Sequence, residues 1–150
     1  MGKEIQFVKV DLDDREVEHA VAYFCDGRYC SQAILLAFGE KYKLDDDTAI
    51  KISCGLNSGA RCASICGAAL GAVLVIGMKH GDSNDICNLE VEKFLKLFGD
   101  KMGGLNCRDI LGCDIFTPEG RAQASEGGLF GTVCVEAVTC AAQILKDQGY

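Results

Sequence analysis

The chain has 150 residues, of which 49% are hydrophobic, and a formal net charge of −7 at neutral pH. This length suits one domain with one buried core, so we expect a single domain over residues 1–150. The acidic balance, with no cluster of Lys and Arg, excludes the electrostatic surface of a nucleic-acid-binding protein. One Pro, no Trp and many Ala, Leu and Ile residues favour helices over a β fold.

Apolar residues at helical spacing predict two helices in the first part of the chain. The first is capped by Asp13 or Asp14 and stops at Gly27. The second begins near Tyr29 and runs to about residue 42, with Cys30 on its apolar face. Three aspartates at 45–47 then open a short helix ending at Gly55, because acidic residues in a first turn complement the helix dipole.

The middle of the chain predicts a loop over residues 55–61 and a central helix after it. Residues 62–78 carry no charge but fall short of the roughly twenty residues that span a membrane. We therefore expect a buried helix ending near residues 77–81, and no membrane span. Gly67 and Gly71 leave one face almost without side chains, which indicates close approach by another backbone, a cofactor or a second copy in a homodimer, or ordinary tight packing.

The last third of the chain predicts three further helical elements. Asn88 is expected to cap a helix through Met102, and a short turn follows at 107–111. Thr117-Pro118 indicates a helix start with Pro at the first helical position. The last helix runs over about 132–146, and no strand pattern or internal repeat occurs. The predicted fold class is all-α, a single compact helical bundle with a central Gly/Ala-rich buried helix.

The ten cysteines do not form any Cys-x-x-Cys pair. This excludes a zinc ribbon, a thioredoxin-type site, a bacterial ferredoxin and covalent haem of the c type. If the thiols act together, they must meet from distant segments. The amino terminus lacks the apolar stretch of a signal peptide, so we expect a cytoplasmic protein with reduced thiols.

Four segments resemble a known family. It is described as redox-active and is named for its C_GCAxxG_C_C pattern. The resemblance covers about residues 15–147, and the segments are Gly27-Arg-Tyr-Cys30-Ser-Gln-Ala33, Cys66-Gly-Ala-Ala-Leu-Gly71, Cys107-Arg-Asp-Ile-Leu-Gly112 and Cys134, the last resembling the family's final cysteine.

The resemblance implies that these four cysteines are the redox-active residues. The family is often encoded near transporters, which implies a redox or transporter-associated partner. Its similarity to split-Soret cytochromes implies an iron–sulfur centre. This chain departs from the family where a glycine run usually precedes the central cysteine; here the run is interrupted by Leu56, Asn57, Ser58, Arg61 and Cys62.

The residues themselves add a physical argument for thiolates. Cys30, Cys66 and Cys134 lie in the first turns of predicted helices, where the dipole and free N–H groups stabilise a thiolate. Cys107 is followed by Arg108, whose cation would act the same way. These four are the candidate cofactor and metal ligands, for an iron–sulfur cluster or, as an alternative, zinc. Cys62, four residues before Cys66, is a further candidate ligand.

Three functions follow, and the sequence does not decide whether the protein is an enzyme. The first is an iron–sulfur protein for electron transfer or redox sensing. The second is a metal-free thiol–disulfide or persulfide oxidoreductase, with Cys66 as a nucleophile of lowered pKa and one of Cys30, Cys107 and Cys134 as the resolving thiol. The third is a transporter-associated binding module whose cysteines only pack, since free Cys is commonly buried. Cys113 is a candidate resolving thiol, whereas Cys25, Cys54, Cys87 and Cys140 are expected to pack or lie on the surface.

Overall fold

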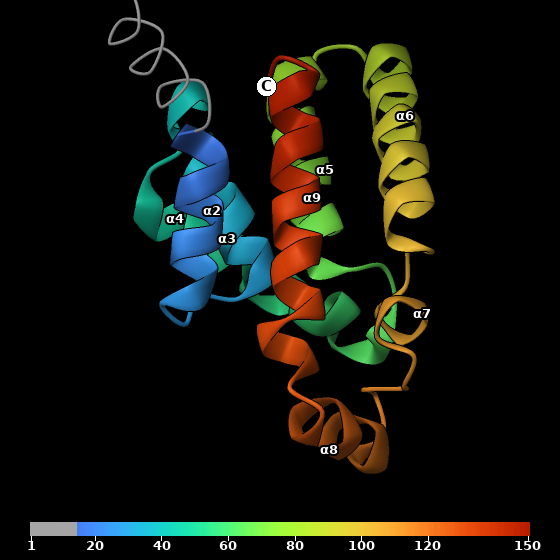
Figure 1. Ribbon diagram of the computed structural model, residues 1–150. Coiled ribbons are helices and arrows are strands. Elements are labelled where there is room, and N and C mark those ends of the chain that lie inside the picture. The colour runs from blue at the N-terminus through green and yellow to red at the C-terminus, as the bar shows by residue number, and fades with distance from the viewer. Residues whose placement is uncertain (1–14) are drawn as a thin grey trace, which may run out of the picture.

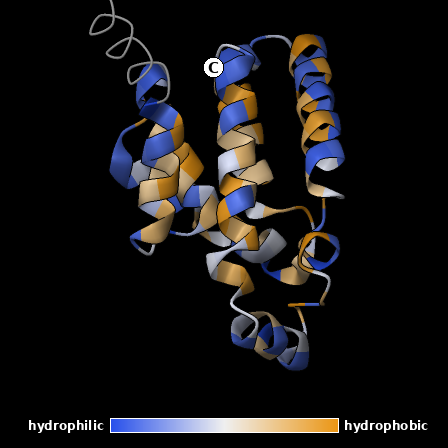
Figure 2. Cartoon of the chain, in the orientation of Figure 1, coloured by the Kyte–Doolittle hydropathy of each residue, from blue (hydrophilic) through white to orange (hydrophobic). Residues whose placement is uncertain are grey.

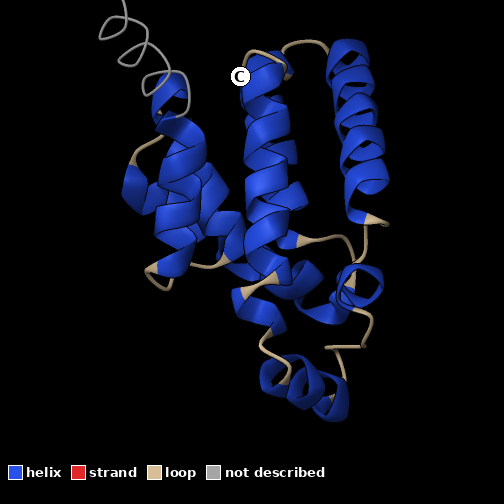
Figure 3. Cartoon of the chain, viewed as in Figure 1, coloured by secondary structure: helices blue, strands red, loops and turns tan. Residues whose placement is uncertain are grey.

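The computed structural model describes residues 15–150, which form a bundle of helices (Figure 1). This confirms the predicted all-α class. In the described part the only β pairing is an isolated antiparallel bridge between Ile65 and Asn106, and Figure 3 shows no strand. The α-helices are α2 (Arg15–Cys25), α3 (Cys30–Gly39), α4 (Asp46–Ser53), α5 (Gly67–His80), α6 (Asn84–Met102), α7 (Cys107–Leu111), α8 (Pro118–Glu126) and α9 (Val133–Asp147).

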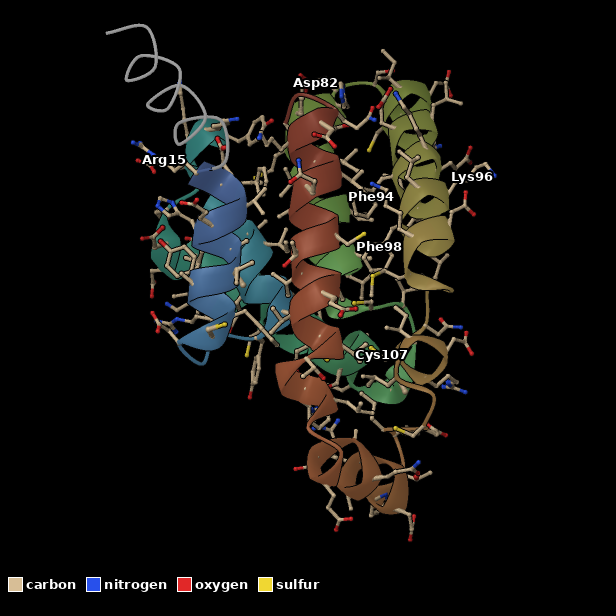
Figure 4. The ribbon with its side chains drawn as sticks, viewed as in Figure 1. Arg15, Asp82, Phe94, Lys96, Phe98 and Cys107 are labelled. Carbon is tan, nitrogen blue, oxygen red and sulfur yellow. The ribbon has the colours of Figure 1, made fainter. Side chains whose placement is uncertain are left out.

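Helices α5 and α9 pack side by side through the middle of the bundle (Figure 1). Helices α2, α3 and α4 cover one side, and α6 covers the other, packed on both α5 and α9. Figure 2 shows apolar and charged residues alternating along α6, as in a helix with one face on the core. That face carries Phe94 and Phe98, whose rings stack 5.9 Å apart and lie between α6 and α9 in Figure 4.

Local hydrogen bonds explain where several helices begin. The Tyr29 amide donates to the Gln32 side chain at 3.0 Å, which satisfies a free N–H at the start of α3. The Ser31 hydroxyl donates to the Ser53 carbonyl at 2.7 Å and ties α3 to α4. Asp45 caps α4 by accepting the Thr48 amide, as its position predicts. The start of α3 at Cys30 is therefore fixed by a bond within the helix and by a bond to α4.

Two predicted boundaries are wrong. Helix α6 begins at Asn84, not at Asn88, because the Ser83 hydroxyl accepts the Ile86 amide and caps the helix earlier. Residues 55–61 are not a simple loop. They contain most of a 3-10 turn, η2 (Cys54–Leu56), and of a wider π-type turn, η3 (Gly59–Ala63). The predicted cap at residues 13–14 lies outside the described residues.

The glycine face of the central helix α5 is covered by α3. A Cβ at Gly71 would lie 2.9 Å from the Ser31 carbonyl oxygen and 3.1 Å from the Ile34 Cβ. A Cβ at Gly67 would overlap the Cys30 sulfur. Close approach of another backbone within the same chain thus explains the glycine pair. A second copy of the chain cannot reach this face, so a homodimer would need a different surface.

The central helix α5 has 14 residues and is largely buried, as predicted. Helix α5 is too short to cross a membrane, but one stretch of the described residues, Leu129–Asp147, is long and apolar enough to do so by length and composition. It comprises the turn η4 (Leu129–Gly131) and α9. Helix α9 packs on α2, α5 and α6, and its Ala141, Ala142 and Leu145 are fully buried. Core helices share these properties with membrane spans.

Two Gly→Ala substitutions in α5 test this packing, because they should have opposite effects. Gly71→Ala should lower the free energy of unfolding by about 1–3 kcal/mol, since its methyl group would push α3 away. Gly77→Ala should raise it by about 0.5–1 kcal/mol, because no atom lies within 4 Å of its Cβ position and Ala favours helix. Urea denaturation measures both, and equal effects would contradict the packing.

Candidate functional site

The four candidate cysteines line one cavity of about 330 Å³. Cys30 and Cys107 are the first residues of α3 and α7, Cys66 is the N-cap of α5, and Cys134 is the second residue of α9. Each thiol therefore lies at the start of a different helix. The rest of the lining consists of Phe24, Tyr29, Asn57, Ser58, Arg61, Ile110, Leu111, Ile115, Arg121, Phe130 and Ala137.

A short antiparallel pairing positions Cys66 next to Cys107. The Cys66 amide donates to the Leu105 carbonyl at 2.8 Å, and the Cys107 amide donates to the Ser64 carbonyl at 2.9 Å. Alternate residues of paired segments point to the same side, so both cysteine side chains face the cavity diagonally across the pair. The Cys107 side chain is close enough to the Cys66 thiol to raise its pKa. Figure 4 shows Cys107 on the side of α7 that faces the bundle.

The segment before Cys66 has a left-handed backbone. Ser58, Ala60 and Arg61 have φ values of 53°, 53° and 65°. Left-handed backbone costs residues other than glycine about 1–2 kcal/mol each. The conformation directs the Ser58 amide to the Cys30 sulfur. Ser58 and Arg61 therefore have a strained backbone, and their side chains line the cavity.

Two arginines hold this segment in different ways. Arg108 donates to the carbonyls of Cys62 and Ala63 at 3.0 and 3.3 Å. It is not among the cavity-lining residues, and these two bonds give it a role in fixing the segment. Arg61 lines the cavity, and its Nη1 donates to Asn57 Oδ1 at 3.1 Å and Ser58 Oγ at 3.3 Å.

The prediction that helix starts lower the thiol pKa is wrong for three of the four cysteines. Burial and then negative charge on Cys66 raise the pKa of Cys30 to about 12, although amide groups of Ser58 and Ser31 oppose this. Burial and charge on the neighbouring cysteines also raise the pKa of Cys134 to about 12.

For Cys66, three effects raise the pKa well above its usual range. They are, from the largest, the hydrogen-bonding interaction with Cys107, which favours the protonated Cys66 thiol, then burial, and then negative charge on Cys107. The amides of Ala68 and Ala69 at the start of α5 oppose them, as the helix-dipole argument predicts, but are outweighed. In the metal-free protein the raised pKa values leave Cys30, Cys66 and Cys134 uncharged at neutral pH.

The remaining candidates lie elsewhere. Cys62 is exposed, its thiol donates to the Gly59 carbonyl at 3.4 Å, and it precedes α5 instead of sharing its face with Cys66. Cys113 is buried outside the cavity lining. Among residues 15–150, no three or more His, Cys, Asp or Glu side chains are grouped so that they could hold a single metal ion.

Sequence reasoning missed two cations at the cavity. Arg61 was noted only as an interruption of the glycine run, and Arg121 on α8 was not noted at all. Arg121 lies over the Phe130 ring at 5.8 Å. No local pattern marks either residue, because they meet only through the packing of α8 and η3 around the cavity.

Relief of backbone strain at Ala60 gives a stability test. Ala60→Gly should raise the free energy of unfolding by about 1 kcal/mol, because glycine adopts the left-handed conformation without steric cost. The matched control Ala22→Gly, at an exposed position inside α2, should lower it by about 1 kcal/mol. Thermal denaturation compares the two, and a loss of stability at both positions would contradict the assigned backbone.

The raised thiol pKa values predict a loss of stability in alkali. In the unfolded chain these thiols ionise around pH 9.0, whereas folded Cys30 and Cys134 ionise only at about 12. Between these values the unfolded state has lost protons that the folded state keeps, so the stability of metal-free protein should fall from about pH 9 towards pH 12. Urea denaturation across this range should show a smaller fall for Cys134→Ser. The exposed control Cys25→Ser should behave like the wild type, and an unchanged fall in Cys134→Ser would contradict the assignment.

Comparison with known proteins agrees with the four-cysteine site. A family model described as "Putative redox-active protein (C_GCAxxG_C_C)" matches residues 28–148 and so includes all four cavity cysteines. No curated protein and no solved structure matches the chain. The match covers most of the chain, and the protein belongs to the C_GCAxxG_C_C family of redox-active proteins.

Proposed function

We propose that the four cavity cysteines hold an iron–sulfur cluster that serves electron transfer or redox sensing. The observation that carries this proposal is that Cys30, Cys66, Cys107 and Cys134, from four separate segments, line one cavity. Four cysteine thiolates are the usual ligand set of both [2Fe–2S] and [4Fe–4S] clusters. When bound, such a cluster takes up and releases electrons.

The arrangement of the donors bears on the choice between a cluster and zinc. Structural zinc needs four donors around a single ion. Among residues 15–150 no three or more His, Cys, Asp or Glu side chains form such a group, although four thiols line the cavity. In a cluster the four cysteines are shared among two or four iron atoms and need not meet at one ion, which suits this cavity better than zinc does.

The surroundings of the sulfurs also suit a charged sulfur centre. Backbone amides of Ser31 and Ser58 reach Cys30, and those of Ala68 and Ala69 reach Cys66. Such N–H···S contacts stabilise thiolate ligands and tune reduction potentials. Metal binding requires deprotonated thiols and releases their protons. The iron ions of a cluster would then balance the negative charge of the thiolates.

A second candidate function is reversible oxidation of Cys66 and Cys107 to a disulfide, favoured by the backbone pairing that places the two cysteines next to each other. Exchange with a substrate disulfide would form the Cys66–Cys107 bond, transfer two electrons and two protons, and release two substrate thiols. The raised pKa of Cys66 slows such exchange, because the thiolate is the nucleophile. We therefore place it second. Nothing in the cavity favours the transporter-associated module over these two functions.

Anaerobic purification with metal analysis separates the two candidates. The cluster predicts brown protein with iron, acid-labile sulfide and absorption near 400 nm, as is usual for iron–sulfur clusters. Cys66→Ser and Cys107→Ser should lose all three signals, because each removes a ligand. Cys25→Ser, at an exposed thiol outside the cavity, should keep them.

Protein that stays colourless and iron-free after cluster reconstitution would contradict the cluster. The same sample would then be oxidised mildly and digested for mass spectrometry. A Cys66–Cys107 disulfide that dithiothreitol reverses would support the second candidate function, and free thiols at both positions would contradict it.

A further inference from the structure

The cavity contains two arginines but no carboxylate. Arg61 comes from η3 and Arg121 from α8, so segments far apart in the chain bring them together. No Asp or Glu is among the lining residues. In the part of the chain that the structure describes, the ion pairs join Lys41 to Glu16, Lys51 to Asp47 and Lys96 to Asp100, and neither cavity arginine takes part in one.

This distribution runs against the composition of the chain, which has 22 acidic and 15 basic residues. Neutral groups hold both guanidinium groups in place. Arg61 donates to Asn57 and Ser58, and Arg121 lies over the Phe130 ring. These contacts orient the two cations without neutralising them, so their charge remains available to an anion.

Much of the remaining wall is apolar, because Phe24, Ile110, Leu111, Ile115 and Ala137 line the same cavity as the arginines and the thiols. A few fixed polar groups in an otherwise apolar cavity are typical of a small-molecule site. The cavity volume, about 330 Å³, is at the small end of the range for such sites.

We propose that the cavity binds a small organic anion, with its carboxylate at Arg61 and Arg121 and its apolar part towards the four thiols. This deepens the proposed function, on which it rests for the redox role of those thiols, by giving the chemical class of molecule that reaches them. It concerns binding alone. Arginine suits the anionic end because its planar guanidinium pairs with carboxylates through two hydrogen bonds.

Two alkylating reagents that differ in charge test the proposal in reduced, metal-free protein. Iodoacetate and iodoacetamide both form a sulfur–carbon bond and release iodide, but only iodoacetate is an anion. Mass spectrometry gives the iodoacetate-to-iodoacetamide rate ratio at each cysteine. The ratio at Cys30 and Cys134 should exceed that at exposed Cys25 by about three- to tenfold, because the arginines attract the anion.

The double variant R61Q/R121Q should reduce this ratio to the value at Cys25, whereas R61K/R121K should keep most of it. Arg28→Gln removes the same charge at an exposed residue outside the lining and should change nothing. Millimolar benzoate should slow the reaction of iodoacetamide with Cys134 in the wild type but not in R61Q/R121Q, and neutral benzamide should slow it in neither.

Equal ratios at cavity and exposed cysteines, or a raised ratio that R61Q/R121Q leaves unchanged, would overturn the proposal. So would equal protection by benzoate and benzamide. The neutral reagent reports any change in folding or thiol access in each variant, so a misfolded variant is recognised. Because no metal is present, failure to assemble a cluster would contradict the proposed function without affecting this result.

Discussion

The close contact between α3 and α5 determines the rest of the site. At Gly67 and Gly71 helix α5 contributes no side chain to the contact, and the Cys30 sulfur occupies the space that a Cβ at position 67 would take. This contact places the start of α3 beside the start of α5, and hence Cys30 beside Cys66. A side chain at either glycine would push α3 away from α5 and so move Cys30 away from Cys66.

Two further constraints complete the cavity. The pairing of residues 64–66 with 105–107 brings Cys107 to Cys66, and the left-handed segment before it turns amides and side chains towards the sulfurs. Both depend on non-local contacts, including the bonds from Arg108 to the segment. The result is a set of neighbouring thiols in which negative charge on one raises the pKa of another. Cys30, Cys66 and Cys134 therefore keep their protons at neutral pH and would release them on binding a metal.

Much of the helical framework was predictable because its signals are local. Asp45 and Thr117 cap the helices that their positions predict, since capping depends on neighbouring residues alone. The predicted start of α6 was wrong because Ser83 and Asn88 are both good capping residues, and the sequence does not show which one caps the helix. The four cysteines were identified from the family segments, and the cavity adds that they face one space.

The charge state of the site residues was less predictable from sequence than their identity. Position at a helix start correctly indicated amides directed at Cys66, but the sign of the pKa shift depends on burial and on neighbouring thiols, which sequence does not give. The same holds for Arg61 and Arg121, whose approach to the cavity results from packing. Local pattern thus predicts which residues matter, whereas tertiary contacts decide their charge state.

We propose that four thiols at four helix starts act as one redox centre. X-ray absorption at the iron edge of the anaerobically reconstituted protein tests this proposal, because it reports the atoms around the metal. We expect iron surrounded by sulfur alone with another iron close by, and loss of that environment when Cys66 and Cys107 are both replaced by serine. Iron bound mainly by oxygen or nitrogen, or a spectrum that the double variant leaves unchanged, would contradict it.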